Sequence, residues 1–243
     1  MTTGGFHLLS GLAFASLLRG EKYRKAKWGI IWGSIFPDID LIASVVIYLA
    51  TGDFALSEYA HRTVTHSWSL LGMIPLVGLA ISLAKPNFKW VLIFSISFTF
   101  GMFTHIIYDL LDGYVAVLAP FSFERYSITH FSYERLLGAT YFKVWNSFDG
   151  MSDVLFYLPI SIWALKRTNI NREIKGAKIL IGLAIFSVIY FSVLMGIAFT
   201  PISVDDHYIL IYAVWGTVIC PISTFLIHIF MRETIQDFSF LSI

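Results

Sequence analysis

The stretch GSIFPDIDLIASVVIYLA, residues 33–50, decides which fold this chain is predicted to have. It is apolar enough to lie inside a membrane, yet Pro37, Asp38 and Asp40 interrupt it. A proline removes a helical hydrogen bond, and each aspartate at the bilayer centre costs about 2.5–3.5 kcal/mol on insertion scales. Irregular backbone at that depth is tolerated only where it is buried in protein or lines a wet cavity. The stretch therefore predicts a membrane helix broken by an extended segment, which turns both carboxylates to one side.

The composition of the whole chain is that of an integral membrane protein. Of the 243 residues, 57% are hydrophobic and 14% are charged, whereas soluble domains have roughly 45–50% and 25%. The net charge of +1 gives no electrostatic reason to bind nucleic acid. The single cysteine, Cys220, excludes a disulfide framework or a cysteine-based zinc site within one chain. We therefore expect the lipid bilayer, and no nucleic acid, as a partner.

Apolar runs predict the architecture. Six of them are long enough to cross a bilayer, or nearly so, and a shorter run at residues 5–18 predicts a short N-terminal helix. The six runs are residues 28–50, 67–84, 90–111, 150–165, 177–199 and 208–231. We therefore expect an all-α, polytopic membrane helical bundle with about six spans plus the short helix. It forms a single domain over residues 1–243, with the site in 1–149 and additional membrane helices in 150–243.

Basic residues predict the orientation of the bundle. They concentrate in residues 19–27, 85–89 and 166–178 and in the C-terminal tail, which are every second connection along the chain. Loops rich in lysine and arginine tend to stay on the cytoplasmic side. We therefore expect a multi-pass protein of the inner (cytoplasmic) membrane whose other connections face outward. The longest of these, residues 112–149, is rich in aromatic residues, and it predicts either an interfacial aromatic belt or a lid over a site.

Metal-binding side chains gather in the first half of the chain. On the predicted orientation they lie at the bilayer midplane or nearer the outer side, since Asp38 is roughly 15 Å from the cytoplasmic end of its span. They can therefore converge in one pocket that faces the outer leaflet. The candidate metal ligands are His7, Asp38, Asp40, His61, His66, His105 and Asp109.

The spacing of four of these candidates indicates how they converge. His105 and Asp109 are four residues apart, so they share one face of a helix. His61 and His66 are five residues apart, which is a poor spacing for one helix face but suits a loop that leads into a helix. We therefore expect two ligands from a helix and two from a loop.

Three other histidines are expected to lie outside this set. A lone histidine in an apolar span more often makes a structural hydrogen bond than binds a metal, and His228 fits that description. His207, beside two aspartates, is predicted to lie in a loop, and the role of His130 stays open. The buried carboxylates are different, because two ionised aspartates in one site repel each other. A bound divalent cation would remove that repulsion.

The types of ligand indicate the metal. Imidazole and carboxylate without thiolate suit zinc, manganese or iron. Seven candidates are too many for one tetrahedral zinc with an open position, so we expect two divalent metals, zinc before manganese or iron. Two metals about 3.5–4 Å apart activate water and clamp the oxygens of a phosphoester. Arg62 is predicted to hold the phosphate unless it pairs with Glu58, and Asp40 is predicted to be the general base if it is not a ligand.

The order of the motifs gives a resemblance to a known family. GFHLLSG, GSIFPDIDLI, HRTVTHSW, GMFTHIIYDLLDG and LAPFSFERYSI follow one another between residues 4 and 128. This order resembles the YdjM-like family of bacterial and archaeal inner-membrane proteins, which are described as metal-dependent hydrolases. Some members are named for control by the SOS repressor. The combination of PDID, HRxxTHS and HxxxD is specific, and it implies a class of reaction without naming a substrate.

A more distant likeness is to the zinc phospholipase C and single-strand nuclease enzymes. Those enzymes have further histidine ligands after HxxxD, and this chain has no second pair with that spacing, which speaks against a third metal. Their order of ligands is matched here by His7, Asp38, His61 or His66, His105 and Asp109.

We therefore expect a membrane-embedded metal-dependent hydrolase. Its substrate would be a phosphoester of a lipid or lipid-linked molecule that enters from the outer leaflet and is attacked by metal-activated water. The alternatives are a membrane transporter or channel and a non-catalytic metal-binding membrane protein. An ion path should show polar residues through the whole depth of the membrane, whereas the last two apolar runs contain few. The sequence specifies neither the substrate nor the oligomeric state.

Overall fold

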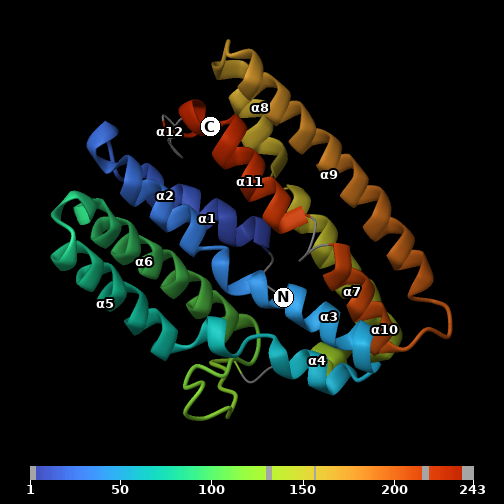
Figure 1. The fold of residues 1–243 in the computed structure, drawn as a ribbon. Coiled ribbons are helices and arrows are strands. Elements are labelled where there is room, and N and C mark those ends of the chain that lie inside the picture. Colours follow the sequence, from blue (N-terminus) through green and yellow to red (C-terminus); the bar gives the residue numbers. More distant parts are fainter. Residues whose placement is uncertain (1–3, 130–132, 156, 215–218, 237–243) are drawn as a thin grey trace.

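The computed structural model of the protein consists of helices joined by loops (Figure 1), and it describes residues 4–129, 133–155, 157–214 and 219–236. The α-helices are α1 (Gly4–Ser16), α2 (Arg24–Gly33), α3 (Asp40–Thr51), α4 (Phe54–Ala60), α5 (Trp68–Ala84), α6 (Lys89–Asp112), α7 (Tyr133–Leu155), α8 (Tyr157–Arg167), α9 (Asn171–Ile197), α10 (Val204–Val214), α11 (Cys220–Phe230) and α12 (Arg232–Gln236). The 3-10 helices are η1 (Glu21–Tyr23), η2 (Phe36–Ile39), η3 (Val64–His66) and η4 (Pro86–Phe88). These residues form no strand, so the all-α prediction is confirmed.

The described residues contain two to four candidate membrane spans, and the predicted count of six is not confirmed. Two single helices are long and apolar enough to cross a membrane, and two bent pairs of helices would each cross as one span. The single helices are Pro86–Asp112 and Asn171–Ile197. The bent pairs are Glu21–Gly33 with Phe36–Thr51, at 51°, and Phe54–His66 with Trp68–Ala84, at 41°.

Two of the predicted runs differ from the observed helices. The run at 150–165 covers the end of α7 and most of α8, and α7 already begins at Tyr133. Much of α7 is amphipathic, so a search for continuous apolar residues does not reveal its first half. The run at 208–231 covers α10 and α11. Residues 156 and 215–218 of these two runs lie outside the described part.

The break in the first bent pair lies at the PDID motif. α2 ends at Gly33 and α3 begins at Asp40, and η2 lies between them with Pro37 in its first turn. A proline fits there because the first turn of a helix does not use its missing N–H. The predicted extended segment is therefore wrong, because PDID forms a tight helical turn. That turn sends Asp38 and Asp40 toward different partners.

Close packing of α2 on α6 fixes the position of this break. A Cβ atom on Gly33 would come within 2.0 Å of the Phe98 carbonyl oxygen. A Cβ atom on Gly101 of α6 would come within 2.3 Å of the Ile30 carbonyl oxygen. Small residues allow membrane helices to approach each other this closely. The contact brings the end of α2 beside the C-terminal half of α6, where His105 lies.

The second half of the chain packs against the first. α9 lies along α7 and α8, and α10 packs on α3. Buried side chains from both halves, such as Leu8, Leu41 and Phe191, belong to one hydrophobic core. The Tyr48 hydroxyl of α3 donates a hydrogen bond to the Asp206 carboxylate of α10. The helices after residue 150 therefore support the elements that carry the candidate ligands.

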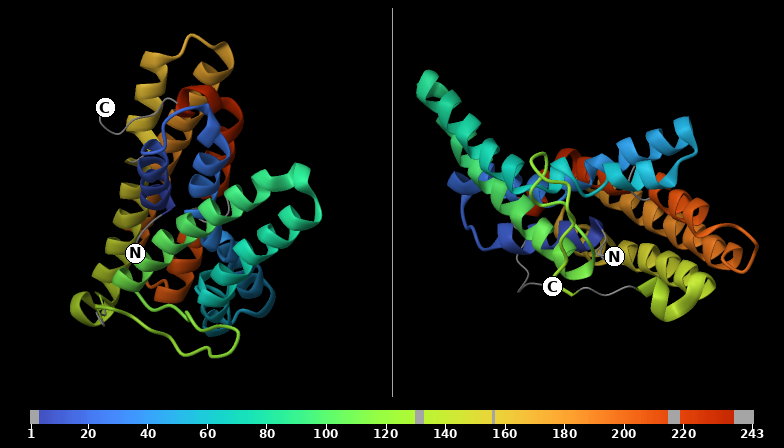
Figure 2. Two further views of the ribbon diagram at one scale, coloured as in Figure 1. Left: turned by 90° about the vertical axis from the view of Figure 1, so that its left-hand side faces the viewer. Right: turned by 90° about the horizontal axis from the view of Figure 1, so that it is seen from below.

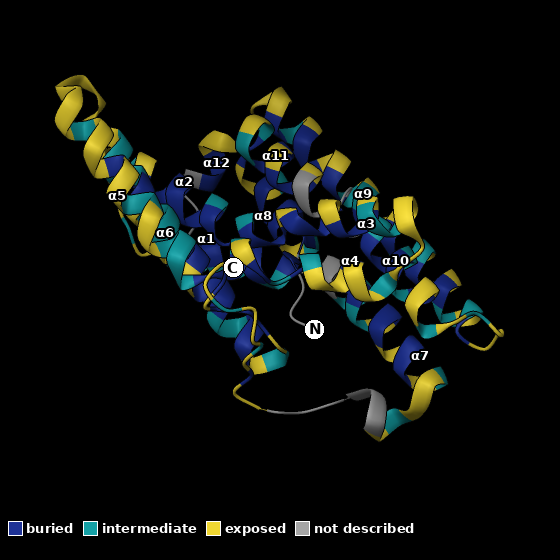
Figure 3. Cartoon of the chain, turned by 60° about the horizontal axis from the view of Figure 1, so that its bottom comes forward, coloured by how far each residue is buried: buried dark blue, intermediate teal, exposed yellow. Residues whose placement is uncertain are grey.

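α5 and α6 form a hairpin that projects from the other helices (Figure 2). Apolar side chains are exposed along much of this hairpin (Figure 3), and Leu76 and Leu83 of α5 are 66% and 74% exposed. Gly78 is the one buried residue in α5. Exposed apolar surface of this extent marks contact with a partner or with lipid. In a membrane the hydrocarbon chains of the lipids would cover it.

The long connection after α6 is a loop only in its first half. Residues 113–129 form an irregular loop that is closed by paired backbone hydrogen bonds of 2.9 Å between Val115 and Tyr126. The chain then enters α7, which has a kink at Gly138, where φ is 72°. The connection predicted at 112–149 is therefore part loop and part helix.

Candidate metal centre

Two of the candidate ligands, His105 and Asp109, lie side by side on α6. The His105 Nε2 atom is 3.3 Å from Asp109 Oδ2, as the spacing of four residues predicts. The Nδ1 atom of His105 donates a hydrogen bond of 2.8 Å to the carbonyl oxygen of Ser34, because a carbonyl oxygen can only accept. This bond fixes the tautomer of the neutral ring, so that Nε2 is the acceptor and faces Asp109.

The break in the first bent pair supplies Asp38. Its Oδ1 atom lies 3.4 Å from His105 Nε2. Its Oδ2 atom is buried and makes no hydrogen bond within the described residues. Burying a carboxylate oxygen without a hydrogen-bond donor is costly. A cation bound between Asp38 and His105 would lower that cost.

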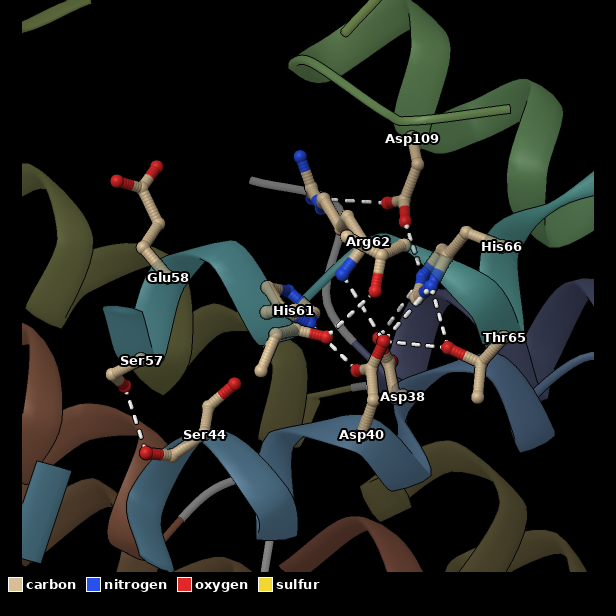
Figure 4. A network of polar contacts seen from close by, with 12 residues as sticks. Asp38, Asp40, Ser44, Ser57, Glu58, His61, Arg62, Thr65, His66 and Asp109 are labelled. Atoms are coloured by element: carbon tan, nitrogen blue, oxygen red, sulfur yellow. Dashed lines mark hydrogen bonds and ion pairs between the residues drawn. The ribbon is translucent and has the colours of Figure 1, made fainter. Parts of the chain in front are cut away.

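The loop before α5 supplies His66 from η3. Its Nε2 atom lies 3.0 Å from Asp109 Oδ2 and 3.2 Å from His105 Nε2. Its Nδ1 atom faces away from these residues, 3.2 Å from Asp40 Oδ2 and 3.0 Å from the Thr65 hydroxyl. His66 thus has one nitrogen in the cluster and one against a supporting carboxylate. Figure 4 shows this arrangement around His66.

The four-residue group Asp38, His66, His105 and Asp109 has the dimensions of a metal site. Each residue is buried and offers one ligand atom, and these atoms all lie within 4.8 Å of one another. Separations of 3.0, 3.2, 3.3 and 3.4 Å occur among them, together with one of 4.0 Å between His66 and Asp38. Zinc–ligand bonds of about 2.0–2.1 Å at tetrahedral angles place ligand atoms roughly 3.3 Å apart. Four of the separations are close to this value, so the group has the size of a site that could hold a metal ion.

The hydrogen-bond pattern of the two imidazoles supports the same interpretation. Both Nδ1 atoms face groups that accept hydrogen bonds, the Ser34 carbonyl and the Asp40 carboxylate. In a neutral ring the other nitrogen is then an acceptor. Two such Nε2 atoms, 3.2 Å apart, converge with carboxylate oxygens, which are acceptors as well. Acceptors gathered in a buried site require a cation among them, either protons or a metal ion.

His7 lies at the edge of the four-residue group. Its ring stacks on the His105 ring, with the centroids 3.6 Å apart and the planes 19° apart. Its Nε2 atom is 3.7 Å from Asp109 Oδ1. The side chain is fully buried, and neither ring nitrogen makes a hydrogen bond within the described residues. His7 therefore lies beside the four-residue group and is not one of its members.

Asp40 lies one layer outside the four-residue group. Its Oδ1 atom is 2.7 Å from His61 Nδ1, and its Oδ2 atom accepts hydrogen bonds from the Arg62 backbone N–H at 3.0 Å and the Thr65 hydroxyl at 2.5 Å. His61 shares this outer layer because its bonded nitrogen faces Asp40. The structure thus brings four of the seven predicted ligands together, and it places Asp40, His61 and His7 around them.

Arg62 reaches the same centre from the loop. Its Nη2 atom donates to Asp109 Oδ1 at 3.0 Å. Its backbone has φ of 58°, a left-handed conformation that residues other than glycine rarely adopt. Gly113 makes room for the guanidinium, since a Cβ atom there would come within 2.2 Å of Nη1. The alternative partner in the prediction, Glu58, instead lies 3.4 Å from Arg125 Nη1.

One neighbour of the site was not predicted from the sequence. The Tyr212 ring of α10 lies 5.6 Å from the His61 ring, centroid to centroid, in an edge-on arrangement. Tyr208, four residues earlier, packs against Tyr212 with centroids 5.5 Å apart. The sequence feature that could have predicted this neighbour is the spacing of the two tyrosines, four residues apart on one helix face within an apolar run. The second half of the chain therefore contributes to the wall of the site as well as to its support.

The remaining histidines have structural contacts. His228 accepts a hydrogen bond of 3.1 Å from the indole of Trp32, as predicted for a packing residue. His207 is buried in α10, where its Nε2 atom is 3.2 Å from the Ser147 hydroxyl, so the prediction of a loop residue is wrong. The helix extends to His207 because Ser203 caps it, accepting a hydrogen bond of 3.0 Å from the Asp206 N–H. His130 lies outside the described residues.

Helices with apolar exposed faces and a buried cluster of histidine and aspartate define a class, that of helical membrane proteins with a candidate metal centre. The chain belongs to the YdjM inner membrane protein family, whose sequence profile matches residues 1–202. This match contains every candidate ligand and extends beyond residue 128, where the recognised motifs end. No curated protein and no solved structure gives a significant match. The family description confirms the resemblance and the inner membrane, and it leaves the hydrolase activity unconfirmed.

Proposed function

We propose that this protein is a membrane-embedded metal-dependent hydrolase whose metal is held by Asp38, His66, His105 and Asp109. The observation that carries the proposal is the convergence of four buried ligand atoms within 4.8 Å of one another. A protein that spans a membrane rarely buries two carboxylates and two imidazoles together without a functional reason. The three elements that supply them, η2, η3 and α6, are separate in sequence and meet only here.

Zinc suits this ligand set best, with manganese or iron next, because the set combines imidazole and carboxylate without thiolate. The described residues form one group of this kind, which supports one metal at this position. The second metal expected from the sequence has weaker support. Asp40 and His61, which would be needed for it, bond to each other at 2.7 Å instead of facing a shared position.

A divalent cation in this centre would supply an activated water and would neutralise charge on a phosphoester oxygen. Arg62 is the residue of this chain best placed to hold a substrate anion. Its guanidinium already pairs with one oxygen of Asp109, and a guanidinium binds phosphate oxygens with the same planar geometry. Asp40 is better placed to orient His66 than to accept a proton, because three groups already occupy its oxygens.

The position of the centre favours a lipid or lipid-linked substrate. The four-residue group lies near the end of α6 that is opposite η1 and η4, the turns beside which the basic residues of 19–27 and 85–89 lie (Figure 1). On the predicted orientation this is the outer side of the membrane. The group is buried among apolar helices, so a substrate that arrives within the outer leaflet has a shorter route to it than one in bulk water.

The closed appearance of the centre favours one alternative, a non-catalytic metal site. Four protein ligands fill a tetrahedral shell, as in structural zinc sites, whereas catalytic sites keep one position for water. Cobalt substitution separates the two readings, because the visible spectrum of Co²⁺ responds to its ligands. Added phosphate should change the spectrum of an open centre and leave that of a closed centre unchanged.

Metal analysis of the purified protein tests the proposal first. The wild-type chain should contain a stoichiometric amount of divalent metal, and Asp38→Ala and His105→Ala should lose it while circular dichroism shows an intact helical fold. His228→Ala is the matched control, because this histidine also lies in an apolar helix but binds Trp32. A well-folded, metal-free wild-type protein would contradict the proposal.

A panel of substrates then tests the reaction itself. Phospholipids in vesicles and short-chain, water-soluble phosphoesters should both be hydrolysed by the metal-loaded protein, and a chelator should abolish the activity. Arg62→Lys keeps the charge but loses the planar, two-pronged contact, so it should raise KM for the phosphoester more than it lowers kcat. Metal-loaded protein that hydrolyses nothing in the panel would favour the non-catalytic alternative.

A further inference from the structure

The loop at residues 113–129 carries exposed apolar side chains. Phe121, at its turn, is 88% exposed, and Phe123, Tyr126 and Ile128 are exposed as well. Together with Tyr59 of α4, whose ring lies 5.4 Å from that of Phe123, they form the aromatic tip. Exposed apolar side chains gathered on one loop mark a surface that binds something other than water.

The aromatic tip continues the apolar surface of the α5–α6 hairpin. The loop begins at Gly113, directly after the candidate span that ends at Asp112. Figure 1 shows the loop at the lower ends of α5 and α6, away from the turn that joins these two helices. Aromatic side chains with a polar edge favour the boundary between hydrocarbon and lipid headgroups. The position and the composition of the tip thus both match that boundary.

The body of the loop is tied to the segment that carries the metal ligands. The Ala116 N–H donates to the Arg62 carbonyl oxygen at 2.9 Å, and the Trp68 N–H donates to the Val117 carbonyl oxygen at 2.8 Å. The Arg125 guanidinium donates to the backbone oxygen of Glu58 at 2.7 Å. These bonds lie on both sides of His61 and His66 in the chain. The tip and the centre are therefore parts of one connected unit.

We propose that the aromatic tip inserts into the outer leaflet and that phospholipids are its binding partner. The tip then sets the depth of the loop, and the loop holds Arg62 level with the phosphate groups of the surrounding lipids. The insertion stands without the proposed function. A further consequence is that lipid phosphates reach the centre by this route, and this consequence rests on the proposed function.

Spin labelling tests the insertion directly. A nitroxide attached to Phe121→Cys, in a Cys220→Ser background, should collide with dissolved oxygen more than with a water-soluble nickel chelate when the protein is in phosphatidylcholine–phosphatidylglycerol vesicles. The control is a label on Asp205→Cys, an exposed polar position at the start of α10, which should show the opposite preference. A label at position 121 with the same access to the nickel chelate as the control would overturn the proposal, and the tip would then bind a protein or no partner.

Hydrolysis assays test the consequence separately. The double variant Phe121→Ser/Phe123→Ser should lower the hydrolysis of vesicle lipid by about tenfold, the order expected from one buried phenylalanine, and leave that of a water-soluble phosphoester unchanged. Leu83→Ser is the matched control, since Leu83 is similarly exposed at the other end of α5. Equal loss with both substrates would overturn the route for lipids. Absence of all activity in the wild type would instead contradict the proposed function, while the spin label still decides the insertion.

Discussion

Asp40 connects the loop after α4 to the candidate metal ligands, and it does so through several short contacts. It accepts from the Arg62 N–H and the Thr65 hydroxyl, bonds to His61, and faces the Nδ1 atom of His66. A carboxylate behind a metal-bound histidine fixes the tautomer of the ring and makes it a stronger ligand. We therefore propose that Asp40 positions His66, a role that differs from the predicted roles of ligand or general base.

Asp40→Asn should therefore weaken metal binding without abolishing it. The expected loss of affinity is about 10- to 100-fold, as is typical when such a supporting carboxylate is changed, and it can be measured by competition with a chromophoric chelator. Glu58→Gln is a suitable control, because Glu58 pairs with Arg125 near the surface. An Asp40→Asn protein with wild-type affinity would show that Asp40 does not orient His66, and complete loss of metal would make it a ligand.

The sequence specified part of the centre at this scale. The sequence predicted that His105 and Asp109 lie side by side, because residues four apart on a helix share one face. The outer position of Asp40 and His61 was not predictable in the same way. It depends on the backbone of the loop, including the left-handed φ of 58° at Arg62, and on the 3-10 turn at η2, which only the packing of the whole chain determines.

At the scale of elements, the contact between α2 and α6 positions the ligands of two different segments. Gly101→Ala should destabilise the protein by roughly 1–3 kcal/mol, because the added carbon would overlap the Ile30 carbonyl oxygen. Gly72→Ala is the matched substitution, since a Cβ atom on Gly72 of α5 meets nothing within 4 Å. Thermal unfolding in detergent should show a lower Tm for the first variant and an unchanged or slightly raised Tm for the second. Equal Tm values would mean that α2 and α6 are not in close contact.

Bound metal should also stabilise the assembly of these elements. A ligand that binds only the folded state raises the free energy of unfolding, and the four-residue group draws on η2, η3 and α6. A chelator should therefore lower the Tm of the wild-type protein and have no effect on Asp38→Ala. A wild-type Tm that does not respond to the chelator, in protein shown to lose its metal, would contradict a link between the centre and the fold.

The elements themselves were predicted unevenly. The helix around residues 90–111 and the break at PDID followed from a long apolar run and from a proline between carboxylates. The bends of 51° and 41° did not follow, because a continuous hydropathy run does not distinguish a straight span from two helices that meet at an angle. α7 was missed in part because its polar residues interrupt the apolar run while leaving an amphipathic helix.

At the scale of the whole molecule, a buried carboxylate holds the C-terminal helix. Glu173 of α9 is fully buried and accepts hydrogen bonds from the backbone N–H groups of Glu233 and Thr234, at 2.8 and 3.1 Å. Glu173→Ala leaves these two groups unpaired, at a cost of about 1–3 kcal/mol for a buried donor. Trypsin should then cut more rapidly after Arg232, and the metal content should stay unchanged because the centre lies at the opposite end of the helices.

The control for this prediction is Glu21→Ala. Glu21 pairs with Arg24 at 2.9 Å on the exposed surface, so its removal should not alter cleavage after Arg232. Equal rates of cleavage in wild-type protein and Glu173→Ala would show that the carboxylate does not retain α12.

The order of the polar residues along the chain bears on biosynthesis. A ribosome delivers Asp40 before any of its partners, which lie 21 to 25 residues further along. During that interval the carboxylates of PDID have none of the donors that surround them in the folded protein, and hydrocarbon is an unfavourable environment for them. We therefore expect the first bent pair to wait at the insertion machinery until the loop with Arg62 and His66 has emerged. The two bent pairs would then be released from the insertion machinery into the bilayer together, as one unit.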